Sequence, residues 1–198
     1  IGRGEPIKDT ARVLSRYLDG VMIRTFGHEI VEEFAQYASI PVINALTDLL
    51  HPCQALTDLL TAQEHKGKDL KGLKMAYIGD GNNMTHSLMY ACAKVGMNFA
   101  SASPKGYEPN AQVVANAKLD AAQSGSTIEI LNDPFAAAKD ADILYTDVWA
   151  SMGQEAEHDE RVKIFKDYQI NNELLSVADK RAIVMHCLPA HRGEEIAE

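Results

Sequence analysis

Long apolar runs and an excess of basic residues are both missing from this sequence. No stretch approaches the roughly 20 apolar residues that a membrane-spanning helix requires. Lys and Arg number 19 against 28 Asp and Glu, which gives a net charge of −9. Nucleic acids and anionic membranes are bound by basic faces, so we expect neither as a partner. A small anionic ligand is compatible with this charge, because a few local cations and helix N-termini can hold it.

Cysteine is also scarce. The 198 residues include Cys53, Cys92 and Cys187, an odd number in unrelated sequence contexts. This favours free thiols in a reducing compartment over a disulfide framework. No export leader is recognisable, so we expect a cytoplasmic protein. The hydrophobic content of 46% and the length suffice for one large domain or two small ones with a real core.

The spacing of apolar residues predicts alternating helices and strands. Helices are predicted over residues 9–18, 28–37, 54–65, 84–95, 110–123, 134–139, 157–165 and 171–178. Strands are predicted over residues 21–23, 41–44, 74–80, 98–103, 127–131, 143–146 and 182–185. Helices of this length between strands form right-handed crossovers and parallel sheets, so the fold class is α/β. The polar stretch 66–71 divides the chain into two domains, 1–65 and 66–198, which we expect to be doubly wound, the first incomplete.

A glycine turn at residues 79–83 follows a predicted strand and opens a helix. It begins like the dinucleotide motif G-x-G-x-x-G, but Met84 occupies the third glycine position. A nicotinamide cofactor is therefore disfavoured, and we expect no cofactor. The preferred interpretation is a turn that presents Asn82 or Asn83 to a ligand carboxylate. The alternative is a turn that uses Gly and Asn only for their positive φ angles.

Arg24, His51 and Gln54 are the candidate groups for binding an anion. Arg24 ends a predicted strand, and His51 and Gln54 flank the start of a predicted helix. A guanidinium, an imidazole and an amide that meet at one sheet edge would hold a phosphate or a developing oxyanion. The alternative for His51 is an exposed residue at an ordinary helix start.

Polar residues also follow the last two predicted strands. Asp147 comes directly after an apolar strand, where a carboxylate can hold an ammonium group, and the loop Ser151-Met152-Gly153 lies nearby. Cys187 comes after the final strand. The alternatives are a turn cap for Asp147 and a small buried hydrophobe for Cys187. His186 is poorly placed as a base for Cys187, because neighbours in extended chain point opposite ways. We expect no metal site, because no clear ligand spacing occurs.

These clusters resemble the motifs of the aspartate/ornithine carbamoyltransferase family. His51-Pro52-Cys53-Gln54 is similar to the family's H-P-x-Q segment. The loop from Asp147 to Gly153 and the segment His186-Cys187-Leu188-Pro189 are similar to D-x-x-x-S-M-G and H-C-L-P, which mark its ornithine branch. Residues 2–26 and 78–87 also match, so the resemblance covers essentially the whole chain.

The resemblance implies transfer of a carbamoyl group from carbamoyl phosphate to the δ-amine of L-ornithine, giving L-citrulline and phosphate without a cofactor. It implies that carbamoyl phosphate is bound by Arg24, His51 and Gln54. It implies that the amino-acid end of ornithine is bound by Asn83, Asp147, Ser151 and Met152, with Cys187 and Leu188 beside the reacting amine. The groups implied in catalysis are Arg24, His51, Asp147 and Cys187. It further implies a carbamoyl-phosphate domain and an ornithine domain, bridged by the helix from Gln54, in a homotrimer.

The sequence departs from the family pattern in one respect. The family's S-x-R-T-R phosphate-binding segment does not occur in the 198 residues, and a closing C-terminal helix is not recognisable, although residues 193–196 have the pattern of a helix start. We therefore expect a fragment with little or no transferase activity of its own. Two alternatives to ornithine carbamoyl transfer stay open: a carbamoyltransferase for another amine such as putrescine, and a non-catalytic binding module of the same fold.

Overall fold

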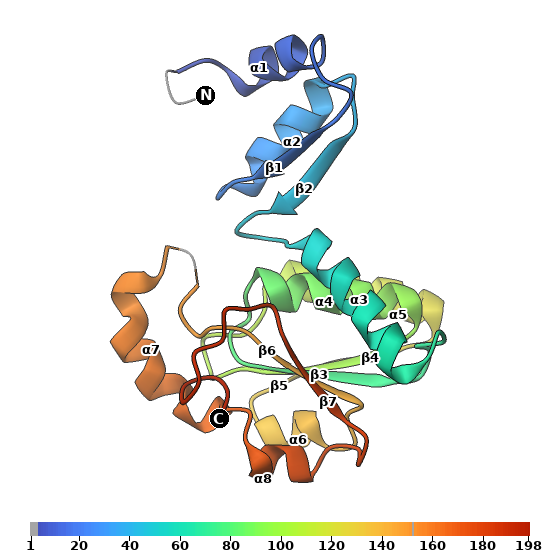
Figure 1. Cartoon of the computed structure of the whole chain (residues 1–198), viewed down its shortest axis with the longest axis vertical. Coiled ribbons are helices and arrows are strands. Elements are labelled where there is room, and N and C mark those ends of the chain that lie inside the picture. The colour runs from blue at the N-terminus through green and yellow to red at the C-terminus, as the bar shows by residue number, and fades with distance from the viewer. Residues whose placement is uncertain (1–3, 152) are drawn as a thin grey trace.

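The computed structural model describes residues 4–151 and 153–198, which form two α/β units (Figure 1). The first unit contains a two-stranded parallel sheet in which Val21 pairs with Val42. Its helices α1 and α2 pack against each other. The elements of this unit are α1 (Ile7–Leu14), β1 (Val21–Arg24), α2 (His28–Tyr37) and β2 (Val42–Leu46).

The second unit is built on a five-stranded sheet with the order β5-β4-β3-β6-β7, in which every neighbouring pair is parallel. Its strands are β3 (Lys74–Ile78), β4 (Asn98–Ala102), β5 (Ile128–Leu131), β6 (Ile143–Thr146) and β7 (Ile183–His186). The chain runs outward from β3 to β5, then returns to the other side of β3 as β6. The carboxyl ends of β3 and β6 therefore mark the switch point of the sheet, where open α/β folds bind ligands.

Helices cover both faces of this sheet, so the predicted doubly wound arrangement is confirmed for the second unit (Figure 1). Alternate residues of β3 face opposite cores: Met75 and Tyr77 pack with one cluster, and Ala76 and Ile78 with the other. One face carries α3 (Pro52–Lys66), α4 (Asn83–Val95) and α5 (Ala111–Ser124), and the other carries α6 (Pro134–Ala138) and α8 (Asn172–Ser176). The remaining helices are η1 (Glu155–Glu157), α7 (His158–Phe165) and η2 (Lys166–Tyr168).

Helix α3 connects the two units. It follows β2 in the chain, contacts that strand, and packs against α4 of the second unit. Ala55 and Ala62 are buried on the side of α3 that joins the core of the second unit, and the carboxylate Asp58 lies between them. Pro52 at the first turn and Gly67 just beyond the end set its limits. No helix among the described residues is both long and apolar enough to cross a bilayer.

Two expectations about helices are wrong. The first predicted helix ends at Leu14 instead of Leu18. Tyr17 is 78% exposed, so no apolar contact stabilises another turn there. The segment 193–196, which has the pattern of a helix start, is a turn between the bridge residues Arg192 and Ile196. Gly193 has a φ angle of +92°, which lies outside the helical region.

Candidate active site

A cavity of about 730 Å³ lies between the two units, at the carboxyl ends of β1, β3, β6 and β7. Its walls come from both units, so it is a cleft that neither unit forms alone. The predicted site residues that line it are Arg24, His51, Gln54, Asn83, Asp147, Ser151, Cys187 and Leu188. Met152, the other predicted site residue, lies outside the described part of the chain. The sequence motifs therefore meet in one place.

Arg24 and His51 lie on one wall of the cleft, which is called the cationic wall because of the Arg24 guanidinium. Arg24 is the last residue of β1, and His51 precedes the first residue of α3. The backbone N–H of His51 donates to Ser87 Oγ at 2.6 Å, which ties the start of α3 to α4. Burial and the nearby Arg24 charge lower the pKa of His51, against the opposing influence of Asp147 and the Ala45 carbonyl. A neutral imidazole has one N–H donor and one acceptor nitrogen, so His51, which lines the cleft, can offer an N–H group there.

Gln54 is held by a buried carboxylate one turn along α3. Its Nε2 donates to Asp58 Oδ1 at 3.0 Å, and Tyr145 Oη donates to Asp58 Oδ2 at 2.9 Å. Sequence reasoning missed Asp58 and Tyr145. The signal for Asp58 is its spacing: it lies four residues after Gln54 and four before Ala62, on the helix face that packs inward.

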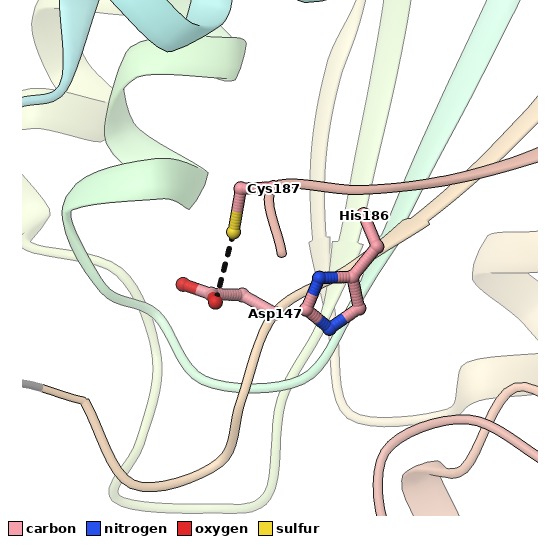
Figure 2. A group of neighbouring side chains, drawn as sticks. All are labelled: Asp147, His186 and Cys187. Carbon is pink, nitrogen blue, oxygen red and sulfur yellow. Dashed lines mark hydrogen bonds between the residues drawn. The ribbon is translucent and has the colours of Figure 1, made fainter. Parts of the chain in front are cut away.

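The acidic wall is centred on Asp147, directly after β6. Its Oδ1 accepts from the Val148 backbone N–H at 2.8 Å and from Cys187 Sγ at 2.9 Å, and its Oδ2 accepts from Asn82 Nδ2 at 2.9 Å. Figure 2 shows the thiol of Cys187 pointing at this carboxylate. Burial, together with the charge of Asp147, raises the pKa of the Cys187 thiol far above its usual range. Cys187 is therefore a protonated hydrogen-bond donor, which is a poor state for a nucleophile.

His186 is engaged elsewhere, as expected from its position beside Cys187. Its Nε2 contacts the buried carboxylate of Glu195 at 3.0 Å, and its Nδ1 accepts from the Leu188 backbone N–H at 2.7 Å. Polar atoms of Asp147, His186 and Cys187 lie within 4.8 Å of one another (Figure 2). Both imidazole nitrogens and the thiol already have partners, so this group is arranged for hydrogen bonding. The bond to His186 also supports Leu188, whose φ angle of +62° is rare for such a side chain.

The two asparagines of the glycine turn have different roles. Asn82 caps α4, because its Oδ1 accepts from the N–H groups of Met84 and Thr85. Its Nδ2 donates to Asp147 and, at 3.3 Å, to Ser151 Oγ. Asn83 Nδ2 donates to the Thr47 carbonyl at 2.7 Å, across the two units. The N–H₂ group that we expected to reach a ligand carboxylate is therefore bonded to the protein in this structure.

Gly81 allows two loops to approach closely beside the cleft. A Cβ atom at this position would lie 2.3 Å from the backbone carbon of Glu108 and the nitrogen of Pro109. The Gly81 N–H also donates to the Tyr107 carbonyl at 2.8 Å. Only Gly79 in this turn has a positive φ angle, at +145°. The turn therefore needs its glycines for two reasons, a backbone angle and a close approach.

A buried ion pair that sequence reasoning missed also lines the cleft. Arg161 on α7 donates to Asp80 Oδ2 and to the Trp149 carbonyl, both at 3.0 Å, and to Glu157 Oε2 at 3.0 Å. Its guanidinium carbon lies 5.0 Å from the centre of the Tyr107 ring. Burial raises the pKa of Asp80, although the Arg161 charge opposes this. The helical pattern of residues 157–165 gave no sign that its arginine would be buried.

Comparison with known proteins places this arrangement in a family. Residues 71–198 match the family model for the Asp/Orn binding domain of aspartate/ornithine carbamoyltransferase, and residues 1–64 match the model for its carbamoyl-P binding domain. Ornithine carbamoyltransferase of Anoxybacillus flavithermus is 65% identical over the whole chain, which spans 63% of that relative's length.

Solved structures agree with this match. The structure of ornithine carbamoyltransferase from Pyrococcus furiosus superposes with a TM-score of 0.94 at 56% identity, over 99% of this chain and 62% of that one. The enzyme from Gloeobacter violaceus gives a TM-score of 0.91 at 56% identity, over 98% of this chain and 65% of that one. The chain therefore belongs to the aspartate/ornithine carbamoyltransferase family.

Proposed function

We propose that the whole protein transfers the carbamoyl group of carbamoyl phosphate to the δ-amine of L-ornithine, releasing L-citrulline and phosphate. The observation that carries this proposal is the cleft itself, with Arg24 and His51 on one wall and Asp147 and Cys187 on another. Such a site suits one anionic substrate and one cationic substrate. Relatives named ornithine carbamoyltransferase at 65% and 60% identity support ornithine as the amine.

Carbamoyl phosphate would bind at the cationic wall. The Arg24 guanidinium neutralises phosphate charge, and the neutral His51 imidazole donates its N–H to the carbamoyl oxygen. That bond strengthens as negative charge develops on the oxygen in the transition state. Gln54 lies in the first turn of α3 and completes this half of the site.

Ornithine would bind at the acidic wall. Asp147 attracts the α-ammonium group, and the Ser151 hydroxyl, already bonded to Asn82, is available to the amino-acid end. The neutral δ-amine beside Cys187 and Leu188 attacks the carbamoyl carbon. A C–N bond forms, the C–O bond to phosphate breaks, and phosphate departs with the electron pair and takes up the proton that the amine loses. Holding both reactants in one cleft supplies much of the rate acceleration.

The test is product formation by the whole protein from carbamoyl phosphate with L-ornithine or putrescine, identified by mass spectrometry. Citrulline as the dominant product is expected. Dominant carbamoyl-putrescine would establish the other amine as substrate. Calorimetric binding of carbamoyl phosphate without turnover of either amine would establish a binding module instead.

We also propose that residues 1–198 alone bind carbamoyl phosphate weakly and therefore have little or no transferase activity. In the described part of the chain, the arginines that line the cleft are Arg24 and Arg161, and Arg161 is committed to Asp80 and Glu157. One uncommitted guanidinium is a poor match for a dianionic phosphate. Citrulline formation by the isolated chain at a rate close to that of the whole protein would contradict this.

A homotrimer and a cytoplasmic location are further proposals. Apolar surface available for subunit contacts is present on the first unit, where Met22 and Ile43 are exposed. Cys53, Cys92 and Cys187 are free thiols, which suits a reducing compartment. Light scattering of the whole protein tests the assembly, with a mass three times that of the subunit expected, and cell fractionation tests the location.

A further inference from the structure

The side-chain amide of Gln54 has a defined orientation. Nε2 of Gln54 donates to Asp58 Oδ1 at 3.0 Å and Tyr145 Oη donates to Asp58 Oδ2, so both oxygens of Asp58 act as acceptors and the Gln54 atom that faces Asp58 is its N–H₂ nitrogen. Gln54 lines the cleft, and its carbonyl oxygen is therefore the atom left for a ligand. The Asp58 carboxylate thus determines that Gln54 offers a hydrogen-bond acceptor, and not a donor, to a ligand in the cleft.

Asp58 also accepts a hydrogen bond from the second unit. It is 4% exposed, and its other oxygen accepts from the hydroxyl of the fully buried Tyr145 at 2.9 Å. The Tyr145 ring stacks on Tyr77, with ring centres 6.0 Å apart. Both carboxylate oxygens therefore have fixed donors. Burying a hydrogen-bonded carboxylate costs more free energy than burying an apolar side chain of the same size. Packing alone therefore does not explain an aspartate at this position.

We propose that Asp58 is a positioning residue that keeps the Gln54 carbonyl oxygen facing the cleft, so that the site selects an acyl phosphate with an amino group over one with a methyl group. This proposal rests on the proposed function, and it identifies the amino group as the feature of the donor substrate that the site recognises. Carbamoyl phosphate offers N–H₂ to the Gln54 oxygen. Acetyl phosphate has the same shape but presents a methyl group, and it leaves that oxygen without a partner.

The test compares two constants in the whole protein: the KM for carbamoyl phosphate and the inhibition constant of acetyl phosphate as its competitor. We expect acetyl phosphate to bind at least about tenfold more weakly in the wild type, as one lost hydrogen bond predicts. Asp58→Asn has the same shape but lets the Gln54 amide turn either way, and it should reduce this ratio at least about threefold.

Tyr145→Phe is the matched control. It removes a bond to the same carboxylate but leaves Asp58 as the acceptor for Gln54, so the protein should melt at a lower temperature with the selectivity ratio unchanged. A change in stability alone thus cannot imitate the effect of Asp58→Asn. Gln54→Leu should lose the selectivity to the same extent, and adding Asp58→Asn to it should change the ratio no further.

An unchanged ratio in a folded Asp58→Asn protein would overturn the proposal, and Asp58→Ser replaces that variant if it does not fold. Equal loss of selectivity in Tyr145→Phe would overturn it too. Failure of the wild type to form citrulline would refute the proposed function separately. In that case, calorimetric titration with carbamoyl phosphate and acetyl phosphate still measures the ratio, and hence the role of Asp58.

Discussion

The thiol of Cys187 lies 2.9 Å from Oδ1 of Asp147, a residue 40 positions earlier in the chain. Strand register explains this contact. β6 and β7 are parallel neighbours in which Thr146 pairs with His186, so the residues that follow this pair emerge side by side at the sheet edge. The acidic wall of the cleft is thus a direct product of the sheet, and its chemistry can be tested residue by residue.

Cys187 is expected to resist alkylation. Its raised pKa keeps the group as a thiol across the physiological range, and alkylation requires the thiolate. Peptide mapping after iodoacetamide treatment at pH 8 should show Cys187 reacting at least about tenfold more slowly than free cysteine in the same solution. Reaction at the rate of free cysteine would show that the thiol is not held against Asp147 as described.

His51 should titrate below its usual pKa of 6.5, since burial and Arg24 both disfavour the imidazolium. The unfolded chain takes up this proton more readily, so His51 costs stability as pH falls below 6.5 and costs none well above it. NMR titration of the His51 ring measures the pKa, and Arg24→Gln should raise it by removing the second cause. A midpoint that Arg24→Gln leaves unmoved would mean that the two groups do not share the cleft wall.

Replacing Arg161 should destabilise the protein severely. Arg161→Met leaves Asp80 buried without its cation, and removal of one partner of such a pair costs about 3–5 kcal/mol of unfolding free energy. The Asp80 pKa is already raised and should rise further, so the loss grows as pH increases and Asp80 must ionise unpaired. Urea unfolding at several pH values measures this, with the exposed Arg181→Met as control. Asp80→Asn added to Arg161→Met should recover part of the loss; no recovery would argue against the pairing.

Gly81→Ala should distort the wall formed by residues 106–108. The new Cβ would lie 2.3 Å from rigid backbone atoms, and overpacking of this kind costs about 1–3 kcal/mol. Gly20→Ala is the control, because its Cβ would meet only the Pro41 carbonyl oxygen at an ordinary 3.6 Å. Thermal melts should separate the two variants. Equal stability of both proteins would mean that the close approach at Gly81 is not required.

Much of the fold follows from local sequence signals. Helix α2 and strand β3 lie where their apolar spacing predicts, and α6 begins at Pro134, the first residue of its predicted range. The predicted helix at the chain's start extends too far, because residue spacing does not report whether a partner surface exists for Tyr17. The spacing of apolar residues shows which face of a helix is apolar. Whether another element packs against that face depends on the tertiary fold.

The residues of the site were likewise predictable in part, from local sequence but not from tertiary contacts. Arg24, Asp147 and Cys187 were predictable because Arg24 ends a strand and the other two follow one directly, and parallel strands bring their carboxyl ends to one edge of the sheet. The contacts that organise the site were not predictable. Asp58 and Tyr145 are 87 residues apart, and nothing local to either one indicates a shared hydrogen bond. Asn83 was expected to face a ligand, yet its amide donates to the Thr47 carbonyl of the first unit. This contact depends on how the two units pack, so the sequence around Asn83 does not predict it.

The most direct test of the central claim is a steady-state kinetic comparison of His51→Asn and Asp147→Asn in the whole protein, with His65→Asn and Asp167→Asn as exposed controls. The two-walled cleft predicts that His51→Asn lowers kcat/KM for carbamoyl phosphate by about 100-fold, as loss of an oxyanion donor does. It predicts that Asp147→Asn raises the KM for ornithine by roughly 100-fold and leaves the KM for carbamoyl phosphate near the wild-type value. An Asp147→Asn protein that binds and uses ornithine as the wild type does would contradict the account.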